Sequence, residues 1–151
     1  MIEVRKHTSL FLTDCDMVVI PVHAKNHHNK SWDRYPINEA KLEYVLAYAQ
    51  YRRLQDANLV EPGEPVISEG IESKTICWIP ITVDVRRQYK MHWIIRSLRR
   101  MKELDLHNKY SIAFPALGAY DGEGVDPVNV YKAVKKYLGN GKFPVDFIVD
   151  F

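Results

Sequence analysis

Two runs of the sequence, "MVVIPV" at 17–22 and "TICWIPITV" at 75–83, are apolar at almost every position. A strand of this kind is covered on both of its faces, as in a parallel sheet that has helices above and below it. The runs "IEVRK", "SIAFPAL" and "FPVDFIVDF" also predict strands, at 2–6, at 111–117 and at the carboxyl terminus. We therefore expect one sheet, with residues 17–22 near its centre.

Segments with helical periodicity separate these strands. The first is predicted to run from about Asn38, as its N-cap, to about Gln55. Its apolar face is predicted to contain Leu42, Val45, Leu46 and Ala49. The second, from about Arg87 to Glu103, combines apolar residues at helical spacing with basic residues that fall mostly on its other faces. It is expected to be an amphipathic helix with a basic exterior.

A third helix is predicted after the last glycines, with Asp126 as its N-cap, Pro127 in its first turn and Gly139 at its end. Strands that alternate with helices predict an α/β fold of three α/β/α layers, with a mixed, largely parallel central sheet and helices on both faces. A chain of 151 residues is long enough for a single domain, which we expect to span 1–151.

The composition excludes some functional classes. The formal net charge of +2 does not by itself indicate a nucleic-acid-binding protein, so any basic surface must be local. Cys15 and Cys77 both lie in apolar runs, which favours free buried thiols over a disulfide framework. The sequence contains no apolar run of membrane-spanning length and no signal-peptide pattern, so we expect a cytoplasmic protein without a membrane partner.

The segment "LGAYDGEGVDP", after residues 111–116, is the strongest candidate for a binding loop. Gly118, Gly122 and Gly124 would let backbone amides approach an anion, and the helix that begins at Pro127 adds its positive end nearby. The alternative is a glycine-rich turn without a ligand, because Asp121 and Glu123 would repel a phosphate unless they point outward.

The polar segment "HAKNHHNKSWDRYP" follows the strand at 17–22. His23, His27 and His28 resemble metal ligands, but Asp33 is the only acid nearby, so we predict no metal and no cofactor. Lys30 would pair with a phosphate or act on a sugar carbon, or else be a solvated loop lysine. Aromatic residues in or beside the two loops would stack on a base or anchor the next helix: Trp32, Tyr35 and Tyr120.

The stretch "SIAFPALGAYDGEGVDPVNVYKAVKKYL" resembles the last third of a macro domain, the ADP-ribose-binding fold. In that family a strand leads into a glycine loop that wraps the diphosphate, and then into the final helix. Upstream, "DMVVIPVHA" resembles the family's second core segment, with Ile20 and His23 at the positions of two asparagines. The similarity covers nearly the whole chain in the right order. It is greatest to the antitoxin branch that removes ADP-ribose from thymidine in DNA.

The resemblance implies a ligand, which is ADP-ribose or a related nucleotide bound in a cleft between the two loops. The ligand-binding residues that it implies are Ile20, Pro21, Tyr35, Gly118, Ala119, Tyr120, Asp121, Gly122 and Gly124. If the protein is an enzyme, the resemblance implies hydrolysis of an ADP-ribosyl bond by water, with His23 and Lys30 as catalytic residues and ADP-ribosylated protein or DNA as substrate. The alternative is a catalytically inactive macro-fold interaction protein that contacts nucleic acid through the basic helix at 87–102.

Overall fold

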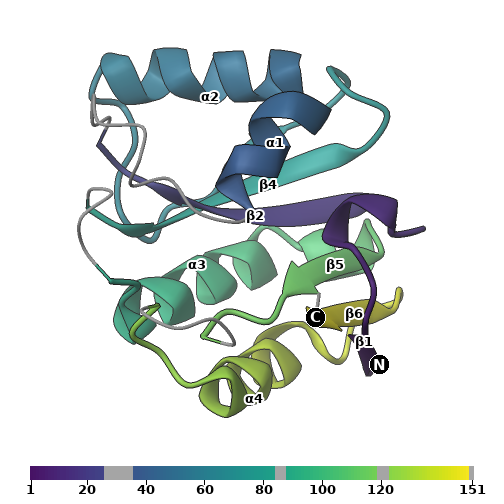
Figure 1. Cartoon of the computed structure of the whole chain (residues 1–151). Coiled ribbons are helices and arrows are strands. Elements are labelled where there is room, and N and C mark those ends of the chain that lie inside the picture. Colours follow the sequence, from purple (N-terminus) through teal and green to yellow (C-terminus); the bar gives the residue numbers. More distant parts are fainter. Residues whose placement is uncertain (26–35, 84–87, 119–122, 150–151) are drawn as a thin grey trace.

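The computed structural model describes residues 1–25, 36–83, 88–118 and 123–149, and it shows a sheet with helices on both faces (Figure 1). The strands are β1 (Ile2–Lys6), β2 (Met17–His23), β3 (Val66–Ser68), β4 (Thr75–Thr82), β5 (Ile112–Pro115) and β6 (Val145–Val149). The helices are η1 (Leu10–Leu12), α1 (Ile37–Glu43), α2 (Val45–Asp56), α3 (Met91–Glu103), η3 (Leu106–Asn108) and α4 (Pro127–Leu138). None of the described helices is long and apolar enough to span a membrane.

The described strands form one sheet in the order β1-β6-β5-β2-β4-β3. Every neighbouring pair is parallel except β3 and β4, which are antiparallel. Helices α1 and α2 cover one face of the sheet and α3 and α4 cover the other (Figure 1). The predicted three-layer α/β/α fold with a mixed, largely parallel sheet is confirmed, and so is the central place of β2.

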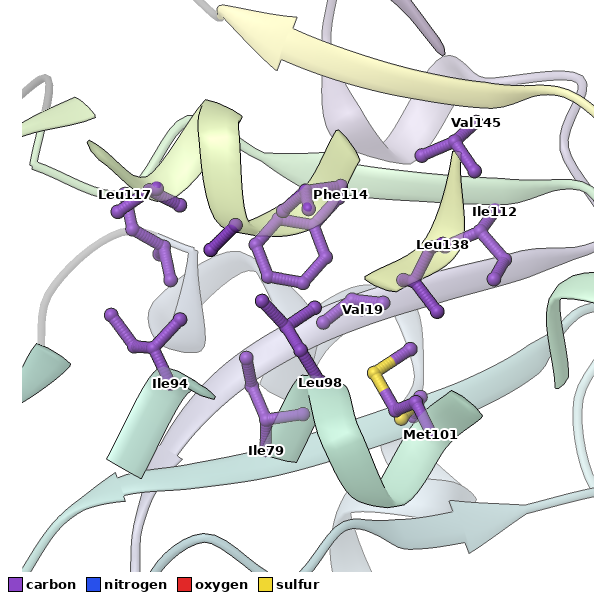
Figure 2. Close-up of a cluster of buried hydrophobic side chains, with 14 of the residues drawn as sticks. Val19, Ile79, Ile94, Leu98, Met101, Ile112, Phe114, Leu117, Leu138 and Val145 are labelled. Atoms are coloured by element: carbon purple, nitrogen blue, oxygen red, sulfur yellow. The ribbon is translucent and has the colours of Figure 1, made fainter. Parts of the chain in front are cut away.

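Strand β2 is apolar throughout because its two faces contribute to two different hydrophobic clusters. Met17 and Val19 pack with residues of α3 and α4, whereas Val18 and Ile20 pack with residues of α1 and α2. Figure 2 shows the first cluster, with Val19 lying close to Phe114 of β5. Successive side chains of a strand point to opposite faces, so burial on both faces leaves no position for a polar residue.

The helix predicted from Asn38 to Gln55 is interrupted. The backbone of Tyr44 leaves the helical region (φ −126°, ψ 56°) and separates α1 from α2. The N-cap of α1 is Pro36 and not Asn38, and it makes no side-chain cap hydrogen bond.

The predicted apolar face of this segment was also wrong, because Leu42, Val45 and Leu46 are all more than half exposed. The face that packs on the sheet contains Ile37, Ala40, Tyr44, Ala47, Tyr51 and Gln55. Both faces are apolar enough to be buried. The tyrosine face is the one buried because its rings cover more area and because the side chains of Tyr51 and Gln55 donate to the carbonyl of His23 in β2.

Other boundaries differ by a few residues. Helix α3 begins at Met91, four residues later than predicted, and β5 ends at Pro115 and not at Leu117. Strand β4 continues through Pro80 to Thr82, and the β2–β4 register shifts directly after Pro80. In α4 the prediction is confirmed.

The cap of α4 explains why its start was predictable. The Asp126 carboxylate accepts a hydrogen bond from the Val128 N–H at 2.9 Å, Pro127 occupies the first turn, and Gly139 is the C-cap.

Candidate functional site

The carboxyl ends of β2, β4 and β5 lie at the same edge of the sheet because these strands are parallel. Here β2 ends in His23, β4 ends in Thr82, and β5 leads to Gly118. In open α/β sheets, ligands bind at this edge. The two segments that sequence analysis selected both leave from it.

His23 is held in place from two directions. Its backbone carbonyl accepts hydrogen bonds from the Tyr51 hydroxyl at 2.6 Å and from Nε2 of Gln55 at 2.7 Å. Its ring Nδ1 lies 3.1 Å from the hydroxyl of Thr82. Burial raises the pKa of Tyr51 well above its ordinary value, so this hydroxyl stays protonated and donates. Helix α2 therefore fixes the point at which the chain leaves β2.

Two glycines of the predicted binding loop have conformations that other residues rarely adopt. Gly118 has φ +90°, and a Cβ there would lie 2.2 Å from the carbonyl oxygen of Val125. Gly124 has φ +82°, and a Cβ there would lie 2.6 Å from the Cβ of Gln88. Both positions therefore need glycine for backbone conformation and for close approach.

Glu123 joins the two described ends of this loop. Its Oε1 accepts a hydrogen bond from the backbone N–H of Gly118 at 2.9 Å, and its side chain is buried, with 2% of the residue exposed. Its own carbonyl accepts the N–H of Tyr89 at 2.9 Å, just before α3. A loop amide is thus bound to an anionic oxygen. The sequence indicated that Glu123 would repel a phosphate unless it pointed outward. Its side chain instead turns into the loop, where its charge would oppose a phosphate.

The structure brings together His23 and the glycine loop at one edge of the sheet, but it does not describe every predicted site residue. Ile20 and Pro21 are buried in β2, and Ile20 packs entirely in the cluster under α1 and α2, where it offers no exposed surface to a ligand. Several predicted residues lie outside the described ranges and their roles stay predictions: Lys30, Tyr35, Ala119, Tyr120, Asp121 and Gly122.

No group of three or more His, Cys, Asp or Glu side chains that would hold a metal ion occurs in the part of the chain that the structure describes. His27 and His28 lie outside that part, so the absence of a metal stays a prediction.

The side chains that support His23 were not predicted from the sequence. Thr82 ends an apolar strand and was treated as part of it. Tyr51 and Gln55 are four residues apart on α2, so they lie on one face, together with Tyr44 and Ala47. The sequence did contain a signal, because Gln55 is a polar residue on a helical face that is otherwise apolar or aromatic. This signal was overlooked because the face with Leu42, Val45 and Leu46 was predicted to be the buried one.

Sequence comparison matches no protein-family model and no curated protein. Comparison with solved structures does find the fold. The macrodomains of Thermus aquaticus DarG and Mycobacterium tuberculosis DarG both superpose with a TM-score of 0.81, at 16% and 17% sequence identity. The first match covers 99% of both chains, and the second covers 99% of this chain and 97% of the other.

A structure of Thermosipho africanus DarTG in complex with ADP-ribose matches 93% of this chain with a TM-score of 0.77 and 16% identity. This match spans only 39% of the DarTG chain. The agreement over almost the full length, together with the sheet order and the glycine loop after β5, shows that the chain has the macrodomain fold.

Proposed function

We propose that the protein binds ADP-ribose, or a nucleotide that contains the same diphosphate, at the edge of the sheet where β2, β4 and β5 end. The observation that carries this proposal is the hydrogen bond from the Gly118 amide to a carboxylate oxygen. In it, an N–H of the glycine loop donates to an anionic oxygen, as the amides of a phosphate-binding loop do. The macrodomain fold and the ADP-ribose in the Thermosipho complex support the choice of ligand.

The same site would also hydrolyse an ADP-ribosyl bond on protein or DNA only if a catalytic group reaches the distal ribose of the ligand. His23 is 4% exposed, and both its carbonyl and its ring have partners. This setting favours a role in anchoring the segment after β2 over direct acid or base work. We assign any hydrolysis to Lys30, and the binding function does not depend on it.

The test of binding is isothermal titration of the purified protein with ADP-ribose, and with AMP as a control that has the base but no diphosphate. We expect ADP-ribose to bind with a dissociation constant in the micromolar range, which corresponds to about −8 kcal/mol, and AMP to bind at least about tenfold more weakly. Equal affinity for the two ligands would contradict a role for the loop in diphosphate binding. The absence of binding by both would refute the proposal.

A second candidate function, contact with nucleic acid, is favoured by the charge of the α3–α4 face. These two helices contain seven basic residues and one acid, Glu103, although the whole chain has a net charge of only +2. Arg100 is paired with Glu64 and Glu103. The remaining six are exposed and form no ion pair with any described residue: Arg96, Arg99, Lys102, Lys132, Lys135 and Lys136.

Tyr137 of α4 lies where the two helices meet. A hydrogen bond with Arg99 of α3 lowers the pKa of its hydroxyl, and the ammonium of Lys136 lies 5.2 Å from the centre of its ring. An aromatic ring beside two cations that form no ion pair with a described residue suits a phosphate backbone and its bases.

Replacing two of these cations should weaken salt-dependent binding of single-stranded DNA. For Arg99→Gln with Lys136→Gln we expect the slope of log K against log salt to become shallower by about 1.4, as two lost phosphate contacts predict. The control Lys41→Gln with Arg53→Gln removes the same charge from α1 and α2 on the opposite face, and it should leave the slope unchanged. Fluorescence anisotropy at several salt concentrations measures both. Equal slopes in the two double variants would rule out this surface as the contact.

A further inference from the structure

We propose that Glu123 is an internal anion that occupies the binding loop in the absence of ligand, and that it sets the loop's affinity and selectivity for phosphate-bearing molecules. This inference rests on the proposed function and deepens it, because it names the group that a diphosphate must displace. The feature that carries it is the contact between the Glu123 carboxylate and the Gly118 amide.

The position of the carboxylate is fixed by its surroundings. The main chain of Glu123 is tied to Tyr89, which is 1% exposed, through the 2.9 Å hydrogen bond to the Tyr89 N–H. The next residue, Gly124, packs against Gln88 so closely that a Cβ would not fit. The backbone at 123–124 is therefore held against the segment before α3. The side chain points back to Gly118 from this fixed base.

The contact between the Glu123 carboxylate and the Gly118 N–H also resembles the contact that an anionic ligand would make. A carboxylate oxygen and a phosphate oxygen are both charged acceptors, and a backbone N–H binds either by a charge-assisted hydrogen bond. One N–H cannot serve both at full strength. A ligand phosphate at Gly118 therefore has to displace the carboxylate, and it then lies close to a second negative charge.

Displacement reduces the apparent affinity, because only the fraction of molecules with Glu123 turned away is competent to bind. Repulsion between the phosphate and the released carboxylate adds to this effect. In a neutral side chain such as glutamine the repulsion vanishes and the competition weakens, because an amide oxygen accepts the Gly118 N–H less strongly than a carboxylate does. Neither effect acts on ligands that place no anion at Gly118, so Glu123 acts as a selectivity residue against phosphates.

The simpler explanation is that Glu123 is only a staple that closes the loop. The two explanations predict opposite effects of a neutral substitution. If Glu123 only closes the loop, a neutral substitution loosens the loop and lowers the affinity for the ligand. If Glu123 competes with the ligand, the same substitution raises that affinity.

The experiment compares ADP-ribose affinity in the wild type, in Glu123→Gln and in the control Glu61→Gln by isothermal titration. Glu61 is exposed, so the control changes the net charge equally without touching the loop. We expect Glu123→Gln to bind about tenfold more tightly than the wild type, and Glu61→Gln to stay within about twofold. Glu123→Ala, which removes the acceptor altogether, is the second variant and should also bind more tightly.

A second readout is independent of ADP-ribose. The Gly118 amide signal in a nitrogen-15 correlation spectrum, recorded during titration with inorganic pyrophosphate, should shift at lower pyrophosphate concentration in both Glu123 variants than in the wild type. If the wild type binds ADP-ribose and the Glu123 variants bind it equally or more weakly, this inference is overturned and the proposed function stands. If no protein binds ADP-ribose, the proposed function is overturned. The pyrophosphate titration then decides the inference alone, and identical Gly118 responses in all proteins refute it.

Discussion

Replacing Gly118 with alanine is expected to lower the free energy of unfolding by about 2–6 kcal/mol and to abolish ligand binding at the loop. The conformation at φ +90° costs a residue with a Cβ roughly 1–3 kcal/mol, and the added atom would lie 2.2 Å from the Val125 carbonyl oxygen. The backbone at Val125 or at residue 118 must then move to make room for the added atom, which adds a packing penalty of about 1–3 kcal/mol. Urea denaturation measures the stability and titration with ADP-ribose measures the binding.

Gly70→Ala is the matched control for this experiment. Gly70 also has a positive φ, +75°, but a Cβ there would meet nothing within 4 Å. The Gly70→Ala variant has the cost of backbone strain without a steric clash. It should therefore lose less stability than Gly118→Ala, and it should retain ligand binding. If the two variants lose the same stability, the close approach between Gly118 and Val125 has no energetic importance.

Phe114→Ala is expected to lower the free energy of unfolding by about 3–5 kcal/mol, as is usual when a buried phenylalanine is truncated. Phe114 is completely buried in β5, in the cluster between the sheet and the helices α3 and α4 (Figure 2). Its loss leaves a cavity directly before the binding loop. Thermal and urea unfolding measure the change.

Phe143→Ala is the control for the core truncation, because Phe143 is 40% exposed and precedes β6. We expect it to cost less than about 1 kcal/mol. A loss as large as that of Phe114→Ala would mean that the effect comes from losing a phenylalanine as such and not from its place in the core.

The parts of the fold that could be predicted from sequence are those with strong local signals. Strands β2 and β4 are continuously apolar, and burial on both faces follows from that alone. Helix α4 has an Asp cap, a proline in its first turn and a glycine at its end, and its bounds were predicted correctly. The three-layer arrangement follows from the alternation of such elements.

Other features depend on contacts between residues far apart in the chain. The insertion of β6 between β1 and β5 is a pairing of distant segments, and no local pattern encodes it. The choice between two apolar faces on α1 and α2 was decided by partners in the sheet, such as the carbonyl of His23 for Tyr51 and Gln55. The inward turn of Glu123 likewise needed the Gly118 amide as its partner. An acid in a glycine loop looks only repulsive when the sequence is considered alone.

A crystal structure of the protein soaked with ADP-ribose would show directly where the diphosphate binds. We expect a diphosphate oxygen within hydrogen-bond distance of the Gly118 nitrogen, with the Glu123 carboxylate displaced from it. A structure in which the ligand binds elsewhere, or in which Glu123 still accepts the Gly118 N–H at saturating ligand, would contradict this expectation.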